Sequence, residues 1–174
     1  MQRKQYMQSA WMGRYRPLIA ALVKHSNINT KLGKNRSETE IGIPLTANEW
    51  QVLETVIEHQ HEVTNMNRLA EAIGLPQSTF SKTVKYLCGA GLVEKYQTAT
   101  NRKNVILKPT ALACDLYEKH AAVLEQYIFG DFFRQLEQIR DEDLEIMIHA
   151  IETLNDTLAP AVPEEEVELI KKDV

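Results

Sequence analysis

The stretch GLPQSTFSKTVKYLCGAGLV, residues 74–93, decides the fold. Gly74 and Pro76 mark a short turn, because glycine adopts positive φ readily and proline does not continue a preceding helix. The turn is followed by apolar residues at the i, i+4, i+7 spacing of one helix face, namely Phe80, Val84 and Leu87. Gly89 and Gly91 are placed to end that helix. The stretch therefore predicts a short turn followed by one amphipathic helix.

Two amphipathic helices are predicted upstream of this turn. The first begins with the capping box Thr46-Ala47-Asn48-Glu49, in which two side chains satisfy each other's backbone N–H groups. Its apolar face consists of Trp50, Leu53, Val56 and Ile57. The apolar face of the second helix consists of Met66, Leu69, Ala70 and Ile73. Gly74 is placed to end this second helix.

A β-hairpin is predicted downstream, with strands over Leu92–Tyr96 and Asn104–Leu107. The loop between them, Gln97–Lys103, is polar and has a basic tip. The order of helix, short helix, short turn, helix and hairpin is that of a winged helix-turn-helix. We therefore predict a mostly α fold with a small β hairpin (α+β), in which residues 45–109 form the winged helix-turn-helix lobe.

Helical segments are predicted on both sides of this lobe. Ser9–Lys24 is expected to be a helix interrupted near Pro17, and Ser26–Pro44 is expected to be a polar loop. After Thr110 a helical stripe is expected from Leu112, Leu116, Val123 and Tyr127. Asp141-Glu142-Asp143 is an acidic start for a last helix, which suits the helix dipole. The apolar stripe of that helix consists of Leu144, Met147, Ile148, Ile151, Leu154 and Leu158.

These flanking helices require an apolar partner that a compact lobe of 65 residues cannot supply. The simplest partner is a second copy of the chain across a two-fold interface, so we expect a homodimer. The expected organisation is residues 1–44 as an N-terminal dimerisation helix with a polar loop, and residues 45–109 as the DNA-binding lobe. Residues 110–158 are then long dimerisation helices, and residues 159–174 an acidic tail.

The helix after the turn has the side chains expected of a DNA-reading helix. With Phe80, Val84 and Leu87 facing the core, its outer face holds Gln77, Ser78, Ser81, Lys82 and Lys85. A recognition helix reads base edges from its N-terminal part, which here includes Gln77, Ser78 and Thr79. Lys82 and Lys85 suit phosphates along its flank. In the hairpin tip, Arg102 is expected to reach the adjacent minor groove, with Lys103 next to it.

Net charge does not by itself favour nucleic acid, because the chain carries −4. The distribution differs from the total: residues 64–110 carry seven Lys or Arg against two Glu, whereas residues 111–174 carry five bases against sixteen acids. A basic central segment in an acidic chain is typical of a local nucleic-acid surface, although ordinary solvated charge is the alternative.

Two segments carry a resemblance to a known family. Leu75–Val93, LPQSTFSKTVKYLCGAGLV, resembles the recognition helix of the MarR (multiple antibiotic resistance regulator) family, including its closing Gly-Leu-Val. Asn101–Thr110, NRKNVILKPT, resembles the family's Asp-Arg-Arg wing, its following strand and the Thr that opens the next helix. The resemblance covers Leu45–Thr110, and outside this range only the helical layout agrees.

The resemblance implies a homodimer, built from the terminal helices, that represses transcription at palindromic double-stranded DNA. It also implies release of DNA when a small, often phenolic, ligand binds. By position, Arg102 is the wing's minor-groove arginine, and the recognition-helix contacts are Ser78, Thr79, Ser81 and Lys82. Two positions depart from the family's pattern. Asn101 replaces the wing aspartate and removes a salt bridge that could brace the wing, and Pro109 replaces a usual apolar residue.

The leading hypothesis is a cytoplasmic repressor that a small aromatic or phenolic ligand releases from DNA. The candidate pocket lies between the lobe and the flanking helices and is bordered by Trp11, Tyr15, Trp50 and Tyr117. A role for these residues as core and interface is an equal alternative. Two other functions stay open: an activator or ligand-independent DNA-binding protein, and a protein-interaction module that has lost DNA binding.

Other chemistry is not favoured by the sequence. No nucleophile motif, phosphate loop or carboxylate pair indicates an enzyme, and no cofactor is expected. The two cysteines, Cys88 and Cys114, form no CxxC, which fits a reducing cytoplasm and leaves redox sensing as a minor alternative. Glu58-His59-Gln60-His61-Glu62 is interpreted as a solvated helix end rather than a zinc site. No apolar run is long enough to span a membrane.

Overall fold

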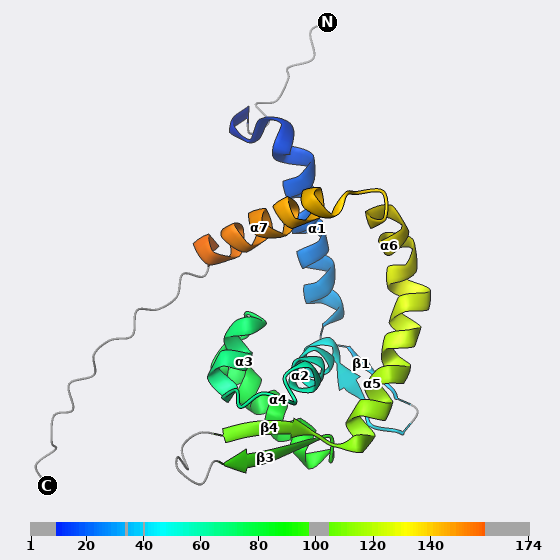
Figure 1. Cartoon of the computed structure of the whole chain (residues 1–174). Coiled ribbons are helices and arrows are strands. Elements are labelled where there is room, and N and C mark those ends of the chain that lie inside the picture. The colour runs from blue at the N-terminus through cyan, green and yellow to red at the C-terminus, as the bar shows by residue number, and fades with distance from the viewer. Residues whose placement is uncertain (1–9, 34, 40, 98–104, 159–174) are drawn as a thin grey trace, which may run out of the picture. The chain divides into compact units, whose positions relative to one another are not determined.

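The computed structural model describes residues 10–33, 35–39, 41–97 and 105–158, and it divides the chain into two compact units, residues 1–122 and 123–174. In the first unit, α2 (Ala47–Glu58), α3 (Met66–Ala72) and α4 (Gln77–Gly89) are grouped against a two-stranded hairpin of β3 (Val93–Gln97) and β4 (Val105–Pro109) (Figure 1). The fold is mostly helical with small antiparallel sheets, which is the predicted winged helix-turn-helix class.

The N-terminal helix is longer than the sequence predicts. A short 3-10 segment, η1 (Ala10–Tyr15), leads into α1 (Arg16–Leu32). The helical segment is interrupted near Pro17, as predicted: Gly13 has non-helical backbone angles, and α1 starts at Arg16 with Pro17 in its first turn, where the missing N–H has no intrahelical partner to lose. The predicted loop from Ser26 is wrong in its first part, because α1 continues to Leu32. The Thr30 hydroxyl donates to the Ser26 backbone carbonyl at 2.9 Å, so this polar side chain finds its hydrogen-bond partner within the helix.

A pair of two-residue strands, which the sequence analysis did not predict, follows α1. β1 (Arg36–Ser37) pairs antiparallel with β2 (Leu45–Thr46), with Arg36 opposite Thr46. α2 (Ala47–Glu58) starts directly after β2 with the predicted capping box. The backbone N–H of Glu49 donates to the Thr46 hydroxyl at 3.3 Å, and the N–H of Thr46 donates to the Glu49 carboxylate at 2.7 Å.

The helix-turn-helix consists of α3 (Met66–Ala72) and α4 (Gln77–Gly89). Gly74 adopts φ +65°, a conformation that favours glycine, and so allows the tight turn between the two helices. The three apolar residues of α4 that define its inner face, Phe80, Val84 and Leu87, are fully buried. They belong to one core with residues from β2 and α2 and with the residue before β3, including Leu45, Val52, Leu53, Val56 and Leu92.

The hairpin consists of β3 (Val93–Gln97) and β4 (Val105–Pro109), in the register Val93 opposite Pro109. The predicted wing tip, with Asn101, Arg102 and Lys103, lies outside the described residues. Lys108 on β4 donates through its ammonium group to the carbonyls of Gln60 and Glu62, in the loop after α2. The base of the hairpin is therefore attached to the helical part of the lobe.

The helix after the hairpin, α5 (Ala111–Leu124), is capped by Thr110, whose hydroxyl accepts from the Ala113 N–H at 3.2 Å and donates to the Gly91 carbonyl at 2.9 Å. Of the four residues in the predicted stripe, Leu116 is buried, whereas Leu112, Val123 and Tyr127 are exposed in the single chain. α5 buries Ala113 and Leu116, whereas Leu112 is 43% exposed, because it lies one position off the face that meets the core.

The second unit consists of helices after residue 122. A π-helical turn, η2 (Glu125–Phe129), precedes α6 (Gly130–Leu136) and the predicted acidic-start helix α7 (Asp141–Leu158). A Cβ at Gly130 would lie 2.9 Å from the Glu125 carbonyl oxygen, so glycine suits this junction. No described side chain of this unit is buried within the single chain.

Candidate nucleic-acid interface

The outer side of α4 is polar and basic over its whole length. Gln77, Ser78, Lys82 and Lys85 are exposed, and Thr79 and Ser81 are half-exposed. The opposite side is fixed in the core through the buried residues Phe80, Thr83, Val84 and Leu87. No acidic residue occurs in the first turn of α4, so the positive end of the helix dipole is not neutralised there. This surface can meet a polyanion without an acidic side chain of α4 in the way.

The first residue of α4 is engaged with the preceding helix. The Gln77 side-chain amide donates to the side-chain oxygen Oδ1 of Asn67 on α3. Asn67 is exposed at the start of α3, and the sequence analysis did not single it out. An amide held in this way has fewer side-chain orientations available, so Asn67 orients the group that is best suited to bidentate contact with a base.

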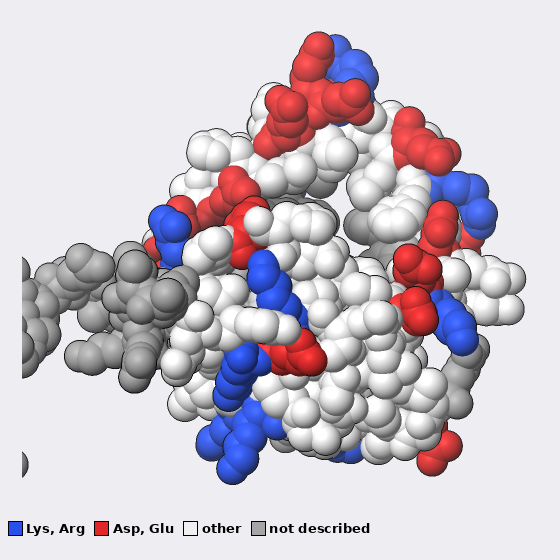
Figure 2. All heavy atoms as spheres, turned by 60° about the horizontal axis from the view of Figure 1, so that its bottom comes forward, with Lys and Arg blue, Asp and Glu red and all other residues white. Residues whose placement is uncertain are grey.

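Lys82 and Lys85 are available for a partner outside the lobe. Neither lysine has a hydrogen bond or ion pair with the rest of the described chain. Both border a hollow of about 560 Å³ on the flank of α4, whose other lining residues are Gly42, Ile43, Pro44, Tyr86, Gly89 and Ala90. Figure 2, which views the side of α4, β3 and β4, shows Lys and Arg side chains gathered along one part of this face.

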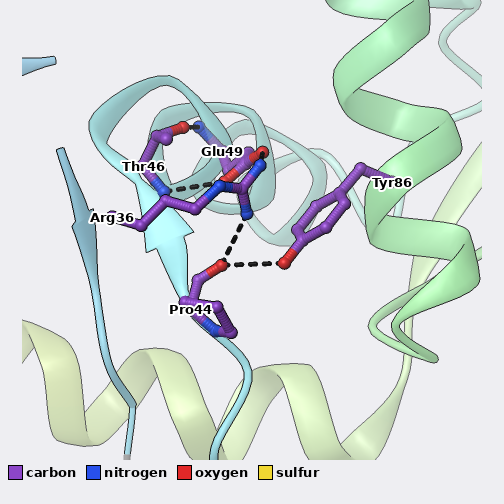
Figure 3. Close-up of polar contacts among 5 residues, drawn as sticks. All are labelled: Arg36, Pro44, Thr46, Glu49 and Tyr86. Carbon is purple, nitrogen blue, oxygen red and sulfur yellow. Dashed lines mark hydrogen bonds and ion pairs between the residues drawn. The ribbon is translucent and has the colours of Figure 1, made fainter. Parts of the chain in front are cut away.

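The flank of α4 is attached to the segment before α2 through Arg36 and Tyr86 (Figure 3). The Arg36 guanidinium donates to the Pro44 carbonyl and to the Glu49 carboxylate, both at 2.8 Å. Its central carbon lies 4.4 Å from the centre of the Tyr86 ring. The Tyr86 hydroxyl donates to the same Pro44 carbonyl at 2.8 Å. These residues lie too far apart in the sequence for the spacing patterns to connect them.

The hairpin contributes less of its charge than the sequence suggests. Lys108 is occupied by the Gln60 and Glu62 carbonyls. Lys95 on β3 is exposed and is a further cation that the sequence analysis did not name. The expected Arg102 and Lys103 lie outside the described residues.

Two of the four expected ligand-site residues join α2 to α5. Trp50 is 8% exposed and stacks on His120, with 3.6 Å between ring centroids and 7° between planes. The indole N–H of Trp50 is buried and finds no acceptor among the described residues. The Tyr117 hydroxyl donates to the Glu54 carboxylate, and burial followed by this hydrogen bond raises the pKa of Tyr117.

The third expected ligand-site residue lies on η1 rather than on α2 or α5. Tyr15 is 58% exposed on η1, next to the Arg14 guanidinium. The side chain of Trp11 lies outside the description. Within the described ranges no group of three or more His, Cys, Asp or Glu side chains is arranged to hold a metal ion. No described helix is both long and apolar enough to cross a membrane.

The comparison with family models gives a match for the central part of the chain. Residues 42–103, which include α2, α3, α4 and β3, match the model of the MarR family. This segment is similar to the MarR family. It starts at the turn before β2, and it includes the whole of the α4 surface described above. A search of curated proteins found no match.

The chain has the same fold as several solved structures, among them a MarR-family protein, and the match covers nearly the full length of each of these structures. The adhesin competence repressor AdcR of Streptococcus pyogenes is 16% identical with a TM-score of 0.56, over 84% of this chain and 99% of that chain. MepR of S. aureus, solved in a complex with DNA, is 16% identical with a TM-score of 0.58, over 87% and 99%. ZitR of Lactococcus lactis, a zinc-responsive member, is 18% identical with a TM-score of 0.54, over 82% and 98%. The likeness to the MarR domain therefore extends to the fold of the flanking helices.

Proposed function

We propose that this chain is a sequence-specific DNA-binding transcriptional regulator, with α4 as the helix that enters the major groove. The observation that carries the proposal is the outer side of α4, where Lys82 and Lys85 are exposed and unpaired within the described chain, next to the polar N-terminal turn. Lysines suit phosphates, and amide or hydroxyl groups suit base edges. The two lysines of α4 would therefore supply affinity for DNA, and its N-terminal turn would supply sequence specificity. Relatives with this fold, MepR and ZitR, have been solved in complex with DNA.

A fluorescence-anisotropy titration tests this function. The probe is a labelled duplex from the region upstream of the protein's own coding sequence, with a scrambled duplex of equal length as control. Specific binding should be tighter than scrambled binding by a factor of about 10³ or more at physiological salt. Equal affinity for the two duplexes at every salt concentration would contradict sequence-specific regulation, and no binding to either would favour a protein-interaction role.

We further propose that the regulator is a homodimer held by the helices outside the lobe. The side chains that support this are large, apolar and exposed in the single chain, on α1 and throughout the second unit: Leu18, Val23, Ile28, Leu32, Val123, Phe129, Phe132, Phe133, Met147, Ile148, Ile151 and Leu154. Exposed apolar side chains in such number are unusual for a monomer surface and are typical of an interface. A second copy has a complementary set by symmetry, and residues 1–44 and 110–158 are the proposed dimerisation segments.

We propose that the direction of regulation is repression and that a small aromatic or phenolic ligand releases the DNA. Support comes from the contact between α2 and α5, where the buried indole N–H of Trp50 has no acceptor among the described groups. A buried donor without a partner costs free energy, and a ligand oxygen would satisfy it. Thermal melting and DNA titration with salicylate, and with benzene as the apolar control, test this step. An unchanged melting temperature and DNA affinity with salicylate would contradict it and favour a ligand-independent regulator.

A further inference from the structure

The apolar core alone does not fix how α4 is rotated about its own axis. Phe80, Val84 and Leu87 hold the helix through contacts that have no preferred direction, and such contacts allow small rotations at little cost. A small rotation is enough to move exposed side chains by the distance that separates a good hydrogen bond from a poor one. A helix that reads bases therefore benefits from a directional contact at its flank.

Tyr86 supplies that directional contact, and its position on α4 is informative. It lies one turn after Lys82 and next to Lys85, and all three side chains line the same hollow. The ring is held on its face by the Arg36 guanidinium at 4.4 Å, and its hydroxyl is held by the Pro44 carbonyl at 2.8 Å. Rotation of α4 in either direction would break the hydroxyl contact or separate the ring from the guanidinium.

Arg36 is suited to this role by the shape of its guanidinium group. A planar group with five N–H donors can stack on Tyr86 and donate in its own plane to two acceptors at once, which a lysine ammonium cannot do. The two acceptors are the Pro44 carbonyl and the Glu49 carboxylate. Glu49 is itself fixed, because its side chain is 8% exposed and its second oxygen accepts from the Thr46 N–H. Arg36 is therefore held from two sides before it meets Tyr86 (Figure 3).

We propose that Arg36 is a positioning residue for DNA reading, which fixes the rotation of α4 through the Tyr86 ring and the shared Pro44 carbonyl. The inference rests on the proposed function, since it assigns to Arg36 the presentation of Lys82, Lys85 and Gln77 to DNA. Arg36 does not touch the nucleic acid in this scheme. It lies on β1, four residues after the last residue of α1, so it also connects the N-terminal helix to the recognition helix along a short path.

The test compares three variants of the full chain that weaken neighbouring contacts. Arg36→Lys keeps the charge but loses the stacked, two-acceptor geometry. Thr46→Ala removes the N-cap of α2, which destabilises the same lobe without touching Tyr86. Tyr86→Phe is the intermediate case, because it keeps the ring over Arg36 and loses only the bond to Pro44. All measurements are made at a temperature where every variant is fully folded by circular dichroism.

Two readouts are measured for each variant. The first is amide hydrogen exchange of residues 77–89 in the free protein, which does not depend on DNA. The second is the ratio of affinities for the specific and the scrambled duplex. We expect Arg36→Lys to speed exchange in α4 and to lower the specific affinity about tenfold, the size expected when one charge-assisted hydrogen bond is lost. Tyr86→Phe should give a smaller change of the same kind. Thr46→Ala should speed exchange to a similar extent throughout the lobe, because it lowers the stability of the whole unit, and it should leave the affinity ratio unchanged.

Two results would overturn the proposal. One is unchanged exchange in α4 of Arg36→Lys, and the other is a loss of affinity ratio in Thr46→Ala that equals the loss in Arg36→Lys, which would mean that general destabilisation is the cause. The proposed function fails separately, if the wild-type protein binds no DNA. In that case the role of Arg36 in reading DNA fails with it, and hydrogen exchange alone decides whether Arg36 fixes α4.

Discussion

The indole ring of Trp50 and the imidazole ring of His120 lie face to face at 3.6 Å, and this stack joins α2 of the lobe to α5. Burial lowers the pKa of His120 from its usual 6.5, and the Glu54 carboxylate opposes this shift in part. The neutral imidazole is therefore the form that the folded protein favours. The stack connects the protonation of one histidine to the stability of the lobe.

This relationship predicts that the protein loses stability in mild acid. Below pH 6.5 the unfolded chain binds a proton at His120 that the folded chain resists, so folding is penalised increasingly as the pH falls toward the lowered folded pKa. Above pH 6.5 His120 is neutral in both the folded and the unfolded chain, so it imposes no penalty on folding there. We expect the melting temperature to drop between pH 7.5 and 5.5, and His120→Gln to reduce this drop. His61→Gln, at an exposed position, is the matched control. An equal drop in wild type and His120→Gln would assign the acid sensitivity to other groups.

The salt dependence of DNA affinity should measure how many phosphate contacts Lys82 and Lys85 of α4 make. Each phosphate contact by a cation releases counterions, with a slope of about −0.9 per contact in a plot of log affinity against log salt. The double variant Lys82→Gln, Lys85→Gln removes four such contacts from the proposed dimer, two in each copy. It should therefore bind more weakly, with a slope shallower by about 3.6 units. Lys171→Gln with Lys172→Gln removes the same charge from the C-terminal segment and should leave the slope unchanged. A slope that responds equally to both pairs would indicate a general charge effect rather than contacts from α4.

Base preference should depend on Gln77 and Asn67 together. Gln77→Ala removes a candidate bidentate contact and should relax the preference at one or two base pairs per half-site, at roughly 1–3 kcal/mol for a good pair. Because Asn67 holds the Gln77 amide, Asn67→Ala should relax the same positions by a smaller amount. The double variant should be no worse than Gln77→Ala in a binding assay over all single-base variants of the site. Additive losses at different base pairs would mean that the two residues act independently.

The wing should contribute affinity rather than base preference. Arg102→Ala should weaken binding to many sequences and should reduce the preference for A-tracts with a narrow minor groove. Asn101→Asp restores the acid of the family's wing, and we expect slightly tighter binding because an ion pair next to Arg102 orders the loop. Anisotropy at two salt concentrations measures both variants. Weaker binding of Asn101→Asp that worsens as salt is lowered would show that repulsion by phosphate dominates.

The proposed dimer should depend on one face of α7. Ile151 lies in the middle of the apolar stripe of α7 and is exposed in the single chain. Ile151→Asp should convert the dimer to a monomer, since a charge in an apolar interface has no partner. His149→Asp changes the opposite side of the same helix and should leave the mass at twice 19.9 kDa in light scattering. A monomeric wild-type protein at micromolar concentration would rule out this interface.

The sequence predicts the lobe well because its elements are short, periodic and individually capped. Phe80, Val84 and Leu87 are buried as their spacing indicates, and the capping box at Thr46 fixes the start of α2. Periodicity fails where a helix has no core to face. α1 buries no side chain in the single chain, and the second half of α1 is mostly polar apart from Ile28 and Leu32, so the sequence pattern there resembles a loop. Leu112 shows a related limit, because helical spacing cannot decide which of two adjacent residues meets the core.

The side-chain contacts around α4 were predicted least well. Arg36 and Tyr86 are 50 residues apart and meet only because β1 pairs with β2 next to the flank of α4. Neither two-residue strand has a pattern long enough to recognise. Asn67 was overlooked for a similar reason, since its bond to Gln77 depends on the angle between α3 and α4 set by the Gly74 turn. Local patterns identify which residues are exposed, and the tertiary fold decides which of them are engaged.

The Pro44 carbonyl accepts hydrogen bonds from both Arg36 and Tyr86, and this has a consequence for mutagenesis. A main-chain oxygen is present whatever amino acid occupies the position, so no side-chain replacement at residue 44 can delete the acceptor. Only the path of the backbone there can displace it, and the proline ring limits that path by fixing φ. Substitutions at the two donors, Arg36 and Tyr86, should therefore impair function, whereas most substitutions at Pro44, which provides the acceptor, should not. A saturation library of residue 44 would be expected to retain function in many of its members, whereas libraries of residues 36 and 86 would not.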